Sequence, residues 1–362
     1  MSKKFYIALV TILFSFIWVA CAGAPENSNN QPSGKTNGVS LQGAGATFPF
    51  PLYSKWVSEY NKLNPNVKID YQSIGSGGGI KQITEQTVDF GASDAPMTED
   101  QLKALKKPLF HIPTTLGAVV VCYNLPGVVG ELKLTPEVLT SIFLGEVKNW
   151  NDPKIATTNP DLKFPNKDIT IVHRSDGSGT TAVFVDYLSK VSKTWADKVG
   201  KGTSVNWPVG LGGKGNEGVT GQIKQVEGAI GYTELVYALQ NKMPFASIKN
   251  KAGKFVIPSP DSVTAAAAAT VSQLPDDMRV SITDAEGDAA YPMSSYTYLL
   301  VYQDMDNKVK AESLAKFLKW AIDDGQKIAK ELNYAPLPEE VIKKVTEKIA
   351  ALKAKGEVLS LS

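Results

Sequence analysis

The sequence is poor in cysteine and histidine, with two of each among 362 residues. Cys21 and Cys122 are far apart, and so are His111 and His173. A standard zinc site needs Cys or His ligands at short, regular spacings, so the sequence excludes one. Neither histidine stands near a nucleophile motif of the G-x-S-x-G type, and no catalytic triad is predicted.

An excess of one charge is also missing. Lys and Arg number 38 against 36 Asp and Glu, for a formal net charge of +2. This balance implies no bulk electrostatic partner, and without a Lys/Arg run or a known motif, nucleic acid is excluded as a partner. The composition, 43% hydrophobic and 20% charged, is that of an ordinary globular protein long enough for two cored domains.

Residues 1–21 have the layout of an export signal, in which two lysines precede the apolar run Phe5–Ala20. Val19-Ala20-Cys21 resembles the lipobox of bacterial lipoproteins, where the cysteine becomes the new N-terminus and carries lipid, although Trp18 replaces the usual Leu. The alternative is a retained membrane anchor, since the run is close to the lower length limit for a span. Either interpretation places the body of the protein outside the cytoplasm.

The polar, low-complexity residues 22–38 predict a flexible tether. With Cys21 acylated, Cys122 has no partner. It lies in the apolar run Val119–Tyr123 and is predicted to be a buried core thiol.

From Val39 onward, strand patterns alternate with helix patterns, which indicates an α/β fold with mainly parallel sheets. A second block runs from about Gly117 to Tyr291. The strand pattern Tyr296–Tyr302 and the helical pattern Ala311–Leu332 follow, and we expect them to rejoin the first domain.

The stretch Arg174–Thr181 is the main candidate site, because it joins a strand pattern to a helix start. The first N–H groups of a helix lack partners and carry positive partial charge. Glycines let an anion approach these groups, the Ser and Thr hydroxyls add donors, and Arg174 supplies a forked cation. We interpret the stretch as an oxyanion cradle; the alternative is a simple helix cap.

A second strand, Gly/Ser loop and helix follow one another over Tyr71–Gln86, which suggests two helix N-termini pointed at one ligand. Gly210–Gly215 also matches G-x-G-x-x-G, but Trp207-Pro208-Val209 before it is a poor strand. Asn216 replaces the Ser or Thr that a Walker loop requires. We interpret Gly210–Gly215 as a surface loop.

Asp94 is unexpected beside an anion, since like charges repel. It is explained if the ligand carries a proton, because the carboxylate then accepts a hydrogen bond from the ligand. Phosphate is protonated at neutral pH and sulfate is not, so a carboxylate facing sulfate stays unpaired. The alternative role for Asp94 is a turn or cap before Pro96.

Several stretches of the sequence, taken together, are characteristic of one protein family, although no single stretch would be. They are Gly43–Pro49, Ile74–Ser76, Val88–Pro96, Arg174 with Asp176–Thr180, Gly210–Asn216 and Gly325–Pro338. With them the chain resembles the phosphate-binding protein of the bacterial phosphate-specific ABC transporter. It departs from the pattern at Gly77, where many relatives have a second Ser, and at His173 and Ser175, which flank Arg174.

The resemblance implies a two-lobed periplasmic-binding-protein clamshell (type II) with one phosphate in the cleft and no cofactor. Lobe I would be residues 39–116 and 292–362, and lobe II residues 117–291. Phosphate would bind Thr47, Phe48, Ser76, Asp94, Arg174, Ser178, Gly179 and Thr180, with Asp176 holding Arg174 in place. The implied protein is an extracytoplasmic monomer, anchored by lipid, that delivers phosphate to the permease of an ABC importer.

Three alternatives stay open at this point. The first is a binding protein for another tetrahedral oxyanion, such as sulfate or molybdate, against which Asp94 argues. The second is a phosphatase-like hydrolase, for which the sequence offers neither a metal cluster nor an evident nucleophile–base pair. The third is a purely structural surface lipoprotein.

Overall fold

A computed structural model describes residues 38–361. The predicted export signal, the lipobox Cys21 and all of the predicted tether except Gly38 lie outside the described residues. Within residues 38–361, no helix is long and apolar enough to cross a membrane.

One eight-stranded sheet organises the described chain, with strand order β2-β1-β3-β11-β4-β8-β6-β7. Its strands are β1 (Val39–Gly45), β2 (Val67–Ser73), β3 (Phe90–Ser93), β4 (Leu109–Tyr123), β6 (Thr170–Arg174), β7 (Leu211–Gly213), β8 (Ala229–Glu234) and β11 (Ser294–Tyr302). Each wing is parallel: β1 pairs with β2 and β3, and β6 pairs with β7 and β8. At the centre, β11 is antiparallel to β3 and β4, and β4 is antiparallel to β8. The α/β prediction is confirmed, with parallel pairing on the two wings.

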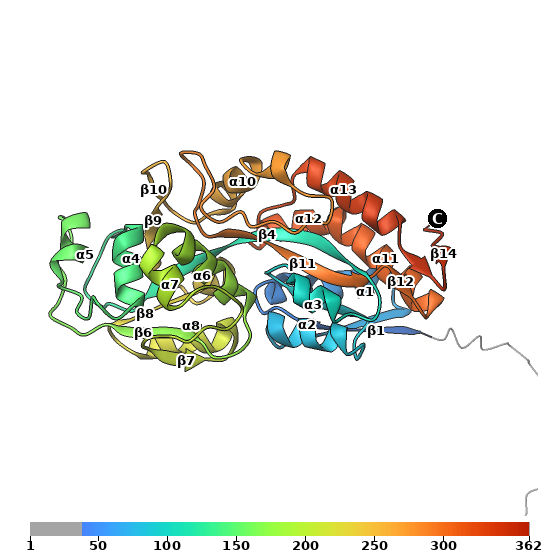
Figure 1. The fold of residues 1–362 in the computed structure, drawn as a ribbon, viewed down its shortest axis with the longest axis horizontal. Helices are drawn as coiled ribbons and strands as arrows, with labels where there is room; N and C mark the ends of the chain where they lie inside the picture. Colours follow the sequence, from blue (N-terminus) through green and yellow to red (C-terminus); the bar gives the residue numbers. More distant parts are fainter. Residues whose placement is uncertain (1–37, 362) are drawn as a thin grey trace, which may run out of the picture. The chain divides into compact units, whose positions relative to one another are not determined.

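The helices pack around this sheet, and the remaining short strands lie in the segments between helices or after α13 (Figure 1). They are α1 (Phe50–Leu63), α2 (Ser76–Thr84), α3 (Glu99–Lys103), α4 (Pro136–Phe143), α5 (Pro153–Thr158), α6 (Gly179–Val191), α7 (Lys193–Lys198), α8 (Gly215–Gln225), α9 (Leu235–Gln240), α10 (Pro260–Ala268), the 3-10 turn Val271–Gln273, α11 (Lys308–Ile322), α12 (Asp324–Glu331) and α13 (Glu339–Ala350). Two three-stranded sheets are formed by β10 (Phe255–Val256), β9 (Ser247–Lys249) and β5 (Lys133–Leu134), and by β12 (Asp304–Met305), β13 (Lys353–Ala354) and β14 (Glu357–Val358).

The long strands β4 and β11 connect the two wings. The first part of β4 pairs with β11, and its last part, Val119–Tyr123, pairs with β8. Every residue of β4 except Phe110 is buried, which explains its nearly continuous apolar sequence. Cys122 lies here as a free, buried thiol, as predicted, and burial raises its pKa.

The C-terminal helices pack on α1. Trp56 Nε1 donates to the Gly325 carbonyl at 2.8 Å, and the rings of Tyr60 and Phe317 meet edge to face at 5.2 Å. The helix predicted over Ala311–Leu332 is interrupted at Asp323, which separates α11 from α12. The lobe boundaries at 116/117 and 291/292 remain a prediction, and lobe I and lobe II keep that meaning below.

Candidate functional site

The loops that begin α2 and α6 lie against each other. The Gly77 N–H donates to the Gly177 carbonyl at 2.8 Å. A Cβ atom at Gly179 would come within 3.0 Å of the Ser76 hydroxyl and of Asp94. Gly75 has a φ of +86°, which favours glycine, and a Cβ there would overlap the Asp176 carboxylate. Glycine therefore allows two helix N-termini, each carrying unpaired N–H groups, to approach from opposite wings.

Arg174 is the last residue of β6 and is only 3% exposed. Asp176 binds it in two places, with Nε to Oδ1 at 2.8 Å and Nη2 to Oδ2 at 2.6 Å. Its Nη1 donates to the Thr180 hydroxyl at 3.3 Å. A guanidinium has five N–H donors, so one remains on each terminal nitrogen for a ligand. Burial raises the pKa of Asp176, but the hydrogen bonds and charge of Arg174 outweigh burial and hold that pKa below its ordinary value.

Asp94 directly follows β3 and is 2% exposed. Its Oδ1 accepts from the Thr297 hydroxyl at 2.8 Å, and its Oδ2 faces the Ser76 hydroxyl at 3.4 Å. Desolvation by burial raises the pKa of Asp94 to about 7, against the opposing effects of Thr297, the Arg174 charge and Ser76. The carboxyl group therefore gains or loses its proton close to neutral pH.

This raised pKa predicts that the ligand-free protein loses stability as pH rises from about 4 to about 7. The folded state holds the Asp94 proton more tightly than the unfolded chain, whose Asp has an ordinary pKa of 3.8. At about 1.4 kcal/mol per pKa unit, the contribution is of the order of 4 kcal/mol, present at low pH and lost by about pH 7. Urea unfolding between pH 4 and pH 8 measures it.

Asp94→Asn is the control for this prediction, because it removes the titrating group and keeps the shape. The pKa of the buried Glu234 is also raised, mainly by desolvation, so the variant keeps part of the slope. Equal pH slopes for the wild type and Asp94→Asn would contradict the assignment to Asp94.

Thr47 and Phe48 form the turn before α1. The Thr47 carbonyl accepts from the Tyr237 hydroxyl at 2.6 Å, and the Phe48 carbonyl accepts from the Tyr334 hydroxyl at 2.8 Å. Both residues are buried. Two tyrosines from far along the sequence thus fix the backbone at the point where α1 begins.

A third helix start, that of α8, also belongs to the site. The Gly215 N–H donates to Asp176 Oδ1 at 3.0 Å, and Asn216 donates to the Thr47 hydroxyl. The prediction of a surface loop over Gly210–Gly215 is wrong for most of the stretch: Leu211–Gly213 form strand β7, which pairs with β6, and Gly215 begins α8. Gly210, Leu211 and Gly212 are exposed, as expected, whereas Gly213 and Gly215 are buried. The signal that could have identified Asn216 is its place at the end of the family stretch Gly210–Asn216.

The side chains of Ser76, Asp94, Arg174, Asp176 and Thr180 form one cluster, and His173 contributes no side chain to it. Its ring stacks on Trp207 with centroids 4.8 Å apart, and its Nδ1 lies 3.0 Å from the Arg174 carbonyl. Neighbouring residues of a strand point to opposite faces, which separates the His173 ring from the Arg174 side chain. The side chains of Ser178 and Thr180 are buried at the start of α6, where the Ser178 Oγ caps the helix by accepting from the Thr181 N–H at 3.0 Å.

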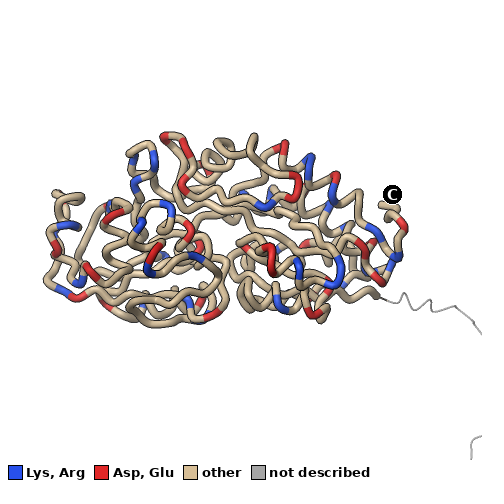
Figure 2. Tube along the Cα trace, viewed as in Figure 1, with Lys and Arg blue, Asp and Glu red and all other residues tan. Residues whose placement is uncertain are grey.

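Lys and Arg residues are interspersed with Asp and Glu residues along the described chain (Figure 2). Within residues 38–361, no three His, Cys, Asp or Glu side chains come together as a metal site would require. At the cluster the Asp176 carboxylate offsets the Arg174 cation, so an anion there would be held mainly by fixed N–H and O–H dipoles.

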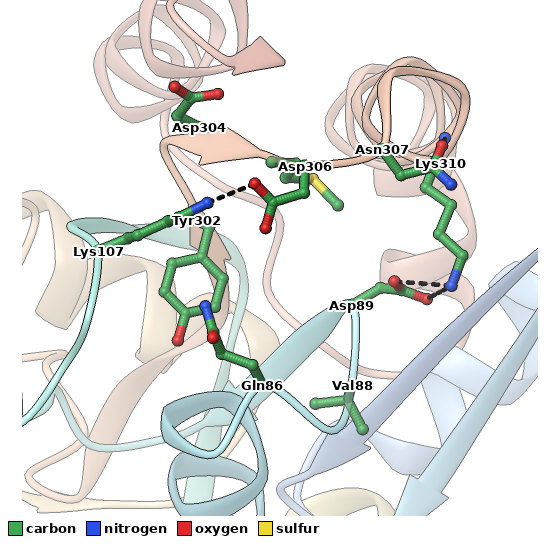
Figure 3. A pocket seen from close by; sticks show the side chains of 10 residues that line it. Gln86, Val88, Asp89, Lys107, Tyr302, Asp304, Asp306, Asn307 and Lys310 are labelled. Atoms are coloured by element: carbon green, nitrogen blue, oxygen red, sulfur yellow. Dashed lines mark hydrogen bonds and ion pairs between the residues drawn. The ribbon is translucent and has the colours of Figure 1, made fainter. Parts of the chain in front are cut away.

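A separate cavity of about 400 Å³ lies at the edge of lobe I, between α11, β12 and the segment after α2 (Figure 3). Its two lysines are already ion-paired. Lys107 binds Asp306 at 2.6 Å, and Lys310 binds Asp89 at 2.8 Å. The carboxylates of Asp306 and Asp89 therefore offset both lysines of this cavity.

Comparison with known proteins agrees with this architecture. The sequence pattern of the PBP superfamily domain matches residues 29–325. The chain is 43% identical over 357 residues to the phosphate-binding protein PstS of Xylella fastidiosa (strain 9a5c), covering 94% of this chain and 97% of the relative. It is 47% identical over 311 residues to PstS of Pasteurella multocida, covering 86% and 90%.

Solved structures with low sequence identity share the fold. One is a high affinity periplasmic phosphate-binding protein (PfluDING) bound with phosphate, with a TM-score of 0.69, 19% identity, and coverage of 88% of this chain and 99% of that chain. Another is an ABC-type phosphate transport receptor from Vibrio cholerae, with a TM-score of 0.54, 17% identity, and coverage of 82% and 100%. The two-lobed fold is therefore established, and on its sequence identity the chain belongs to the PBP superfamily and, within it, to the family of the phosphate-binding proteins PstS.

Proposed function

We propose that this chain is a receptor that encloses one inorganic phosphate between its two lobes and delivers it to an ABC importer. The observation that carries the proposal is the convergence of the α6 start on Ser76 and Asp94, with the Arg174 guanidinium buried beside Thr180. Asp176 already compensates the Arg174 charge, so a bound phosphate would be held by the two remaining guanidinium N–H groups and the helix-terminal donors rather than by net positive charge. The names of the PstS relatives support the choice of phosphate.

Each proposed contact uses a group whose other bonds are already made. Arg174 offers its two remaining N–H groups, and Ser76, Gly179 and Thr180 offer donors at the starts of α2 and α6. Thr47 and Phe48 offer backbone N–H groups, Ser178 adds its hydroxyl, and Asp94 accepts the hydrogen bond of the phosphate proton. We propose binding and closure without chemistry, and hinge closure then stabilises the ligand-bound form.

The first test is a calorimetric titration of the purified protein with phosphate, sulfate and molybdate. We expect phosphate alone to bind tightly. At a free phosphate concentration of 100 times Kd, the free energy of unfolding should rise by about 2.7 kcal/mol, while sulfate at equal ionic strength should leave it unchanged.

Other outcomes of the same titration would replace the proposal. Tight sulfate or molybdate binding would make the protein a receptor for that anion. Turnover of a phosphate ester by pure protein would make it a hydrolase, and no thermal shift with any of the three anions would favour a structural lipoprotein.

We further propose that the receptor is an extracytoplasmic monomer, anchored by lipid on Cys21, that docks on membrane permease subunits. The proposal rests on the sequence of residues 1–21. Mass spectrometry of the mature protein should show Cys21 as the acylated N-terminus, and an intact Met1 would remove the lipoprotein assignment.

A further inference from the structure

Asn216 is a fully buried amide whose side-chain atoms all have partners, and its orientation is fixed. Its Oδ1 accepts from the Glu234 backbone N–H at 3.3 Å and from the Thr233 hydroxyl at 3.2 Å. A backbone N–H can only donate, so the amide oxygen must face β8. The Nδ2 group is thereby turned toward the cluster around Arg174.

The two hydrogens of Nδ2 go to one threonine from each lobe. Nδ2 lies 2.9 Å from the Thr47 hydroxyl and 3.3 Å from the Thr180 hydroxyl. Each hydroxyl also accepts from a second donor: Thr47 from the Asn216 backbone N–H at 3.3 Å, and Thr180 from Arg174 Nη1 at 3.3 Å.

These contacts leave each threonine hydroxyl with a single free function. A hydroxyl has two lone pairs and one hydrogen. The three groups that donate to the two threonine hydroxyls, Asn216 Nδ2, the Asn216 backbone N–H and Arg174 Nη1, cannot accept a hydrogen bond. Both lone pairs of Thr47 and Thr180 are therefore occupied, and only the hydrogens remain. Each hydroxyl can act toward a ligand only as a donor.

We propose that Asn216 is a positioning residue that holds the Thr47 and Thr180 hydroxyls as obligate donors to the bound anion. This inference rests on the proposed phosphate site and deepens it. Both threonine hydroxyls would donate to unprotonated phosphate oxygens. The protonated oxygen of the phosphate would then be placed at Asp94, the acceptor of the site. Because Thr47 belongs to lobe I and Asn216 to lobe II, the Thr47 donor is fixed only when the lobes close.

The test is a calorimetric comparison of Asn216→Ala in two backgrounds, the wild type and Thr47→Val/Thr180→Val. In the wild type, freeing two hydroxyls should weaken phosphate binding by roughly 30-fold. In the double-valine background no hydroxyl remains to be oriented, so the further loss should be under about 3-fold. An equal loss in both backgrounds would overturn the inference, since a merely structural asparagine would act regardless of the threonines.

Asn216→Asp provides a second, nearly isosteric variant. Its carboxylate accepts from both hydroxyls instead of donating, which reverses them and adds negative charge, so phosphate binding should weaken by more than about 1,000-fold. Urea unfolding without phosphate verifies that each variant is folded. Wild-type affinity in Asn216→Asp overturns this inference alone, whereas a wild-type protein that binds no phosphate overturns the proposed function as well.

Discussion

Gly179→Ala should weaken phosphate binding by roughly 100-fold and leave the fold intact. The added methyl group would come within 3.0 Å of the Ser76 hydroxyl, of Asp94 Oδ2 and of Asp94 Cβ, all of them in lobe I. Overpacking of this kind costs about 1–3 kcal/mol, and here the cost falls on the closed arrangement of the lobes. Each step of about 1.4 kcal/mol changes the affinity about tenfold, so a cost of about 2.8 kcal/mol, within this range, gives the expected loss of about 100-fold. Calorimetry with phosphate measures it.

Gly221→Ala is the matched control, because Gly221 lies inside α8 and a Cβ there meets nothing within 4 Å. It should keep wild-type affinity and raise the free energy of unfolding by about 0.5–1 kcal/mol, the usual gain of Ala over Gly in a helix. Gly179→Ala should unfold in urea within about 1 kcal/mol of the wild type when phosphate is absent. Unchanged phosphate affinity in Gly179→Ala would show that the lobes do not close on each other at this point.

Much of the architecture was predictable because local rules determine it. The helix start at Thr98 is a capping box with Gln101, and Pro136 opens α4 after its cap Thr135. The site residues were harder to interpret alone: the start of α6 does include a cap by Ser178, so the cap and cradle interpretations of that stretch are compatible. The family resemblance, carried by stretches spread over the chain, favours the cradle interpretation in addition to the cap.

What the sequence did not reveal depends on contacts between distant residues. Asn216 meets Thr47 across 169 positions of sequence, and Tyr237 and Tyr334 reach the backbone of Thr47 and Phe48 from far along the chain. No periodicity encodes such pairs. The antiparallel centre of the sheet could not be predicted for the same reason, since the pairing of β4 with β11 joins segments that are far apart in the sequence.

Asp94→Asn should reduce the preference for phosphate over sulfate by at least about 100-fold. Above the pKa of Asp94, which burial raises to about 7, the wild type presents a buried, ionised acceptor to a fully ionised oxyanion, a mismatch that costs about 10⁴–10⁵ in binding. The amide of the variant offers an N–H to sulfate and no longer repels it. Competition of sulfate against phosphate, measured by calorimetry at a fixed ionic strength, gives the ratio.

Asp89→Asn is the control that separates this effect from a change in net charge. Asp89 lies just before β3, as Asp94 lies just after it, and its carboxylate binds Lys310 at 2.8 Å and the Gln42 N–H at 2.8 Å, outside the cluster. It removes the same single charge from the same lobe, so long-range electrostatics predict equal gains in sulfate binding for the two variants. Local proton recognition predicts a gain for Asp94→Asn alone, and equal behaviour of the two variants would remove Asp94 from the selectivity mechanism.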